Sequence, residues 1–229
     1  MYAEEARLQE EARRKFKDHL LIVLVSVFII ATVKMVEHTF AISLSHHGLF
    51  PRNPDKLYGV LTMPFLHGDF DHLFANSFSA IVLGLLLFHF YEKVAWRVII
   101  CGWIFGGALL WCMGRANYHI GASGVIYTLS SFLFLSGVLR WRRDRRGVGA
   151  ALVVSFLFGA SVWGVLPLER GISWEGHLFG AIVGAFLAIY YRRLDLPPRY
   201  IDDPEEPDET VPDWYDDSWE DLDEDHRWE

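Results

Sequence analysis

Ser123, which has glycines close on both sides at positions 121 and 124, is a candidate nucleophile. Residues 121–129 read Gly-Ala-Ser-Gly-Val-Ile-Tyr-Thr-Leu, and Ser123 stands where a long apolar run begins. A serine hydroxyl is a weak nucleophile until a neighbouring base takes its proton. Serines in membrane helices also bond back to a carbonyl one turn earlier, which is a purely structural role. A catalytic role for Ser123 therefore needs a base and an anion-stabilising site elsewhere in the chain.

Two other apolar segments carry side chains that can supply these functions. His177, in Trp-Glu-Gly-His-Leu-Phe-Gly, can act as a general base because imidazole titrates near neutral pH. His72 and Asn76 are four residues apart, which places them on one face of a helix. Their N–H groups, with the amides at the start of the Ser123 helix, can stabilise a tetrahedral oxyanion. Glu175 points to a different helix face from His177, so the pattern predicts serine hydrolysis by a Ser–His dyad.

Six apolar runs must position these groups. They cover about residues 20–42, 72–90, 95–113, 123–139, 148–166 and 175–191. Most approach the ~20 residues that a helix needs to cross ~30 Å of hydrocarbon. The sequence therefore predicts an all-α membrane protein, a polytopic bundle of six transmembrane helices. The first run also resembles a signal peptide, but no small-residue cleavage site follows closely, so a retained helix is expected.

Basic residues give the predicted orientation of this bundle. Fifteen of them precede the first run, follow the sixth, or lie between runs two and three or four and five, whereas four lie in the other loops. An excess of Lys and Arg marks the cytoplasmic side. Both termini are therefore expected in the cytoplasm, and runs two, four and six begin at the outer face. Because Ser123, His177, His72 and Asn76 lie near these outer ends, we expect them to converge there.

The charge distribution separates the end of the chain from the rest. The formal net charge is −8, but residues 201–229 hold 15 of the 29 acidic residues and one basic residue, so this tail carries −14 and the rest +6. We expect a cytoplasmic basic N-terminal segment (1–18), a six-helix transmembrane domain (19–192) and an acidic, disordered cytoplasmic tail (193–229). The tail either keeps the protein soluble or binds an unknown partner through its tryptophans.

Small residues predict how the sixth run approaches the fourth. Gly180 and Gly184 follow His177 by three and seven residues, which forms a small-xxx-small face that lets helices pack closely. Tyr127 lies one turn after Ser123, where its ring can pack against the imidazole. We expect this helix contact to bring the base to the serine.

Together these segments resemble the rhomboid intramembrane serine proteases. Residues 121–127 are similar to the family's Gly-x-Ser-Gly segment, residues 65–76 to its His-x-x-x-Asn helix with an upstream histidine, and residues 177–184 to its His-x-x-Gly-x-x-x-Gly helix. The motifs follow in the family's order over about residues 20–192. One departure is that residues 45–70 contain no Trp, whereas many members carry Trp-Arg in the first outer loop.

The resemblance implies a role for each site residue. Ser123 would be the nucleophile and His177 the general base. His72 and Asn76 would form the oxyanion hole, with Gly121 as a supporting backbone position. Tyr127 would pack on the base, and the upstream histidine, His67, would belong to the framework. The implied activity is hydrolysis of peptide bonds in or near the transmembrane segments of membrane protein substrates, with no cofactor.

Other classes of function fit the sequence less well. A catalytically inactive relative that binds membrane clients usually lacks the serine or the base, and this chain has both. A metal site or transporter would use the histidines near the outer loops, His46, His47, His67, His72 and His119, but no His-Glu-x-x-His occurs and no metal is predicted. The α/β-hydrolase elbow is excluded because position 125 is Val rather than Gly.

The sequence also gives expectations for disulfide bonds, partners and cellular location. Cys101 and Cys112 would lie roughly 16 Å apart on one helix, so no disulfide between them is expected. The expected partners are membrane-spanning protein substrates and the lipid bilayer, and no nucleic acid. We expect a multi-pass protein of a prokaryotic plasma membrane, with its active site opening to the outer face.

Overall fold

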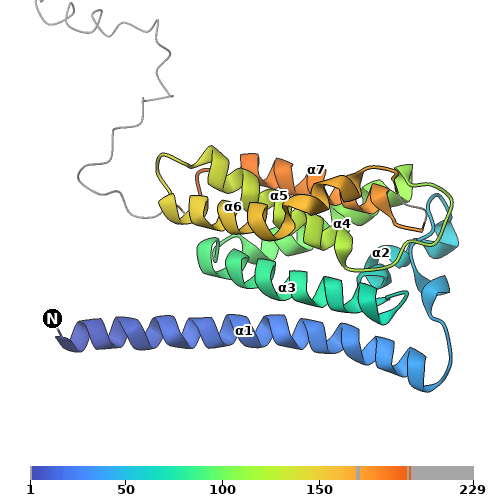
Figure 1. The fold of residues 1–229 in the computed structure, drawn as a ribbon, viewed down its shortest axis with the longest axis horizontal. Coiled ribbons are helices and arrows are strands. Elements are labelled where there is room, and N and C mark those ends of the chain that lie inside the picture. Colours follow the sequence, from blue (N-terminus) through green and yellow to red (C-terminus); the bar gives the residue numbers. More distant parts are fainter. Residues whose placement is uncertain (1, 169–170, 195, 197–229) are drawn as a thin grey trace, which may run out of the picture. The chain divides into compact units, whose positions relative to one another are not determined.

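The computed structural model describes residues 2–168, 171–194 and 196, and these residues form helices and short connections (Figure 1). The long helices are α1 (Tyr2–Thr39), α3 (Phe70–Phe90), α4 (Ala95–Met113), α5 (Ser123–Leu139), α6 (Arg145–Phe158) and α7 (Trp174–Tyr190). The connections contain α2 (Gly59–Thr62) and the 3-10 helices η1 (Ser45–His47), η2 (Pro54–Lys56), η3 (Met63–Phe65) and η4 (Gly159–Val165). No β-strand occurs in these described ranges.

Five of the six predicted apolar runs coincide with a long helix and the run 148–166 with α6 and η4, which confirms an all-helical fold for the described residues. Among the described residues, four helical stretches are long and apolar enough to cross a membrane: Glu4–Thr39, Phe70–Phe90, Ala95–Met113 and Arg145–Val165. The apolar helices α5 and α7 have 17 residues each and are about 25 Å long, which is less than the ~30 Å hydrocarbon core. Six spans and cytoplasmic termini remain predictions.

Two boundaries differ from the sequence-based expectation. The basic segment 1–18 is helical and continuous with the first apolar run, because α1 extends from Tyr2 to Thr39, and its cytoplasmic location stays a prediction. The run 148–166 is not one α-helix, because the α-helical bonding ends at Phe158 and a 3-10 helix continues over Gly159–Val165. From residue 197 onward the acidic tail lies outside the described residues.

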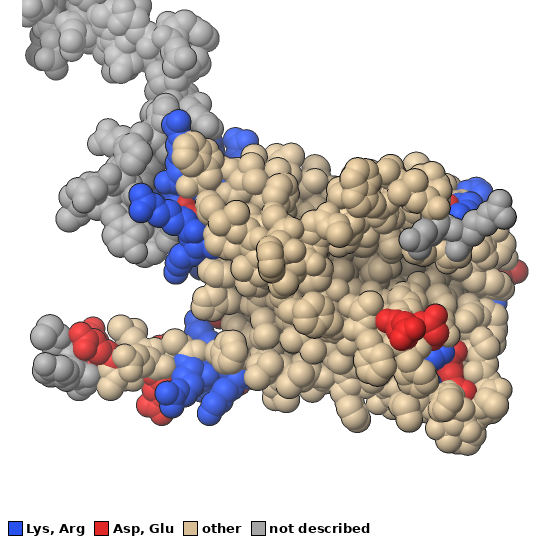
Figure 2. Space-filling model, viewed as in Figure 1, with Lys and Arg blue, Asp and Glu red and all other residues tan. Residues whose placement is uncertain are grey.

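Helix α5 forms the centre of the bundle. It packs against α3, α4, α6 and α7 (Figure 1), and its side chains Thr128, Phe132 and Leu133 are fully buried. Uncharged residues cover the middle of the face seen in Figure 2, while Lys and Arg gather mainly at the end where α1 begins. This distribution suits a helix bundle whose long sides contact hydrocarbon.

Glycines let α7 lie directly against α5, as their spacing predicted. A Cβ on Gly180 would meet the carbonyl oxygen of Gly124, and one on Gly184 would meet the carbonyl oxygen of Thr128. At the same crossing, Thr128 Oγ1 donates to the Gly180 carbonyl at 3.0 Å, and Ser131 Oγ donates to the Ala181 carbonyl at 2.9 Å. Close backbone contact with hydroxyl bonds across the helices is the packing that small residues permit in membranes.

The alternating direction of the helices places the starts of α3, α5 and α7 at one end of the bundle (Figure 1). The segment between α1 and α3 lies at this end as well. It is tied down by an antiparallel pairing of Leu49 with His119 and by Arg52, whose guanidinium donates to the Gly114 carbonyl at 2.7 Å. Cys101 and Cys112 are both free thiols on α4.

Candidate active site

Ser123 and His177 form a direct hydrogen bond between α5 and α7. His177 Nε2 lies 2.9 Å from Ser123 Oγ. Ser123 is the first residue of α5 and His177 is in the first turn of α7, so the Gly124–Gly180 crossing next to them holds both side chains at one level. A serine paired with an imidazole in this way can be activated as a nucleophile.

A backbone carbonyl orients the imidazole of His177. Its Nδ1 lies 2.9 Å from the carbonyl oxygen of Gly164 in η4. A carbonyl only accepts, so Nδ1 must carry the proton, and Nε2 is left as the acceptor for the Ser123 hydroxyl. The carbonyl therefore selects the tautomer that a general base needs.

Tyr127 covers one face of the same imidazole. The two rings are stacked, with centroids 4.2 Å apart and an interplanar angle of 9°. The Tyr127 hydroxyl donates to the Ser161 carbonyl at 2.6 Å, so η4 fixes both the tyrosine and the histidine. The sequence predicted this stacking from the position of Tyr127 one turn after Ser123.

Gly121 brings the donors of α3 next to the Ser123 loop. It has a φ of 109°, in the left-handed region that favours glycine. A Cβ on Gly121 would lie 2.7 Å from His72 Nε2 and 3.6 Å from Asn76 Nδ2. Asn76 is 4% exposed, and its Nδ2 has no hydrogen-bond partner among the described residues. A buried donor without a partner is costly, and it is available to an anion at this point.

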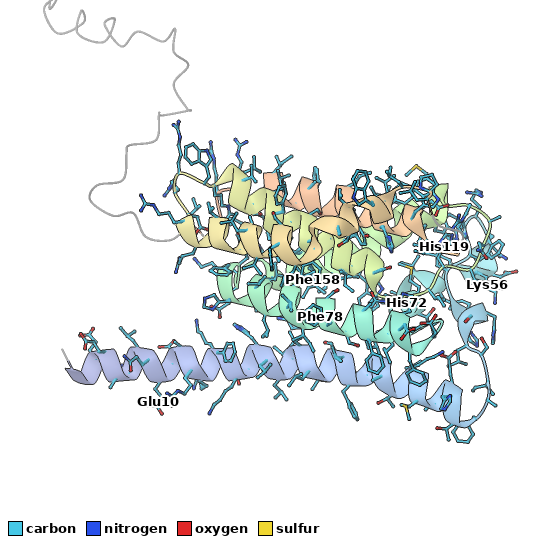
Figure 3. The ribbon with its side chains drawn as sticks, in the orientation of Figure 1. Glu10, Lys56, His72, Phe78, His119 and Phe158 are labelled. Atoms are coloured by element: carbon cyan, nitrogen blue, oxygen red, sulfur yellow. The ribbon has the colours of Figure 1, made fainter. Side chains whose placement is uncertain are left out.

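One cavity connects all of these groups. It has a volume of 1020 Å³, and its walls include Ser123, His177, Tyr127, His72 and Asn76. His72 and His119, labelled in Figure 3, lie at the same end of the bundle. The structure thus brings together the residues that the sequence placed at the starts of three separate helices.

In the described structure, the hydrogen-bond partner of Glu175 is Arg115 rather than His177. Glu175 is buried and accepts from Arg115, whose Nε lies 3.4 Å from Glu175 Oε1. Arg115 also donates to the Ile172 carbonyl, which ties down the segment before α7. Across the described part of the chain, no group of three His, Cys, Asp or Glu side chains is placed to hold a metal ion.

The groups that hold the serine–histidine pair in place carry no signal in the sequence. The carbonyls of Gly164 and Ser161 belong to a segment that was expected to be an ordinary helix, and no side chain there indicates the role. The sequence placed His119 near the outer loops but did not predict its contact with α7: its Nδ1 lies 2.6 Å from Ser173 Oγ at the start of that helix. Burial lowers the pKa of His119, so this histidine is a neutral hydrogen-bonding group near neutral pH.

The arrangement defines an all-helical integral membrane protein with a serine–histidine pair at one end of its bundle. The family model of the Rhomboid domain matches residues 54–194, which is more than half of the chain. The chain belongs to the rhomboid family.

Three relatives match well over half of this chain. An uncharacterized protein of Mycobacterium tuberculosis (strain H37Rv) is 32% identical over 187 residues, which cover 77% of this chain and 75% of that protein. An uncharacterized protein of Mycobacterium leprae is 34% identical over 177 residues, covering 73% and 68%. A protein of Acanthamoeba polyphaga mimivirus, whose name assigns it to the rhomboid proteins, is 31% identical over 158 residues, covering 64% and 81%.

Proposed function

We propose that this protein is an intramembrane serine endopeptidase that hydrolyses peptide bonds in or near the transmembrane segments of membrane proteins. The observation that carries the proposal is the 2.9 Å contact between Ser123 Oγ and His177 Nε2. The Gly164 carbonyl on the other ring nitrogen makes this contact productive, because it leaves Nε2 free to take a proton. Membership of the rhomboid family supports the same reaction.

In the acylation step, Ser123 Oγ attacks the carbonyl carbon of the scissile peptide bond. Its proton moves to His177 Nε2, and the carbonyl oxygen becomes an oxyanion. When the tetrahedral intermediate collapses, the C–N bond breaks and His177 gives its proton to the leaving amine. The products of this step are a new amino terminus and an acyl ester on Ser123.

Donors near the start of α5 would stabilise the oxyanion. Asn76 Nδ2 is buried and unpaired within the described structure, and it approaches the Gly121 loop that precedes Ser123. The ring of His72 lies beside the same loop, and the first amides of α5 lack intrahelical partners. Donors of this kind contribute most where water is excluded and the negative charge develops.

Water completes the reaction by hydrolysing the acyl ester. His177 takes a proton from a water molecule, the hydroxide attacks the ester carbon, and Ser123 leaves as the alkoxide that recovers the proton. Water must therefore reach Ser123, and the 1020 Å³ cavity provides the space. We propose that the cavity opens at the outer face of a prokaryotic plasma membrane, because the basic residues predict the opposite end to be cytoplasmic.

The test compares the wild type with Ser123→Ala in proteoliposomes that hold a panel of single-span substrates. Cleavage by the wild type, mapped by mass spectrometry, should disappear in the variant, and so should labelling by a fluorophosphonate probe. Persistent cleavage by Ser123→Ala would exclude the dyad. A wild type that binds these substrates but neither cleaves them nor reacts with the probe would instead be a non-catalytic, client-binding member of the family.

A further inference from the structure

Helix α1 carries a buried ion pair next to the candidate site. Lys34 and Glu37 are one turn apart, with Lys34 Nζ 3.4 Å from Glu37 Oε2, and their side chains are 13% and 5% exposed. Both residues precede residues 54–194, which match the Rhomboid domain. Burying an ionised side chain in an apolar helix costs free energy, so such side chains pair with other charged or polar groups.

The partner of this ion pair is the loop that leads into α3. Lys34 Nζ donates to the carbonyls of His67 at 2.9 Å and Gly68 at 2.8 Å. With the contact to Glu37, all three ammonium hydrogens are used. The second oxygen of Glu37 accepts from the backbone amide of Leu44 at 2.6 Å. The pair thus connects the end of α1 to the two residues that come just before the α3 cap.

This loop is directly linked to the proposed oxyanion donors. Asp69 follows it and caps α3 by accepting from the backbone amide of His72 at 2.7 Å. The ring of His67 packs against the ring of His72, with centroids 5.0 Å apart. His72 in turn lies against Gly121, beside the unpaired Nδ2 of Asn76. Any shift of the loop would move these donors relative to Ser123.

We propose that Lys34 and Glu37 are positioning residues for the oxyanion hole. The inference rests on the proposed protease function and adds to it a role for α1. Elsewhere α1 is held to α3 by apolar packing, as where Val23 fills the space beside Gly84. The ion pair is therefore not needed to keep the two helices together, and it acts on the loop ahead of His72.

The experiment measures kcat and KM of reconstituted variants on one single-span substrate cleaved by the wild type. Lys34→Met keeps the length of the side chain but removes its donors, and a misplacement of about 1 Å predicts a kcat about 10- to 100-fold lower with KM changed less than about twofold. Glu37→Gln, which keeps the acceptor for the Leu44 amide, should give a smaller loss of kcat. Lys34→Arg restores a charged donor and should recover most of the activity.

A matched control lies on the same helix. Lys15 of α1 pairs with Glu92, just after α3, at 3.1 Å, but both side chains are 47% exposed and lie at the other end of these helices. Lys15→Met should leave kcat unchanged. If Lys34→Met and Glu37→Gln also keep the wild-type kcat, the positioning role is wrong.

A mutant cycle in a background that lacks both donors, His72→Ala with Asn76→Ala, separates positioning from simple destabilisation. If Lys34 acts through these donors, Lys34→Met should lower kcat less than about twofold in that background. Multiplicative losses would contradict the inference. A wild type that cleaves nothing would overturn the protease function and this role together, whereas Ser123-dependent cleavage that is insensitive to Lys34 would overturn this role alone.

Discussion

Gly180 of α7 lies directly against the backbone carbonyl of Gly124 in α5, with no room for a side chain between them. Gly124 follows Ser123, and Gly180 lies one turn after His177. This approach of the two backbones allows the 2.9 Å contact between the serine and histidine side chains. The geometry of the candidate site is therefore a consequence of helix packing.

Gly180→Ala should separate the pair. The added methyl group would push α7 away from the Gly124 carbonyl, and a displacement of about 1 Å predicts a loss of kcat/KM of about 100-fold, with a stability loss of about 1–3 kcal/mol from overpacking. Cleavage assays and thermal unfolding in detergent measure both effects. Gly149→Ala on α6 is the control, because a Cβ there has no described atom within 4 Å. An active Gly180→Ala variant would show that the contact tolerates a wider crossing.

The ring of Tyr127 should contribute more to kcat than its hydroxyl group does. Tyr127→Phe keeps the ring on His177 but loses the bond to the Ser161 carbonyl, so we expect a loss of kcat of only a few fold. Tyr127→Ala removes the stacking surface and frees the imidazole to turn, so its loss should be about tenfold or more larger. Equal activities of the two variants would assign the whole effect to the hydroxyl.

Asn76→Ala should lower kcat by about 100- to 1000-fold with little change in KM, because the donor acts on the transition state and not on the bound substrate. Asn76→Asp keeps the side-chain size but replaces the NH₂ group with an oxygen, so we expect a loss at least as large. Steady-state kinetics on one substrate distinguish the two parameters. A rise in KM at constant kcat would place Asn76 in substrate binding instead.

His67 makes the stability of the fold depend on pH. Burial, followed by the neighbouring His72, lowers its pKa from 6.5 to about 4, and neither ring nitrogen has a described partner. Between pH 6.5 and 4 the unfolded chain binds a proton that the folded protein does not, so stability falls as the pH falls through this window, by about 3 kcal/mol in total. Above pH 6.5 the imidazole is neutral in both the folded and the unfolded state, so this loss of stability is absent.

The measurement is the thermal unfolding midpoint of the detergent-solubilised protein between pH 7.5 and 4. His67→Leu should flatten the decline with falling pH. It should not abolish it, since burial also lowers the pKa of His119. A decline that is equally steep in His67→Leu would show that other groups are responsible.

The sequence alone predicted the helices and the pairing of the main site residues. Apolar runs predict helices because hydrocarbon leaves the backbone no other way to satisfy its hydrogen bonds locally. The spacing of Gly180 and Gly184 from His177 marked the face of α7 that meets α5. The sequence also predicted the ring of Tyr127 on the base, since residues one turn apart share a helix face.

Only the tertiary structure decided what supports those residues. The tautomer of His177 depends on the Gly164 carbonyl, and Glu175 turns to Arg115, although it lies two residues from the base. Lys34 reaches carbonyls 33 and 34 residues further along the chain. Every residue type has a backbone carbonyl, so its identity carries no signal for such a contact. These contacts exist because the packed helices bring particular backbone groups within hydrogen-bonding distance of particular side chains, and that proximity is a property of the fold.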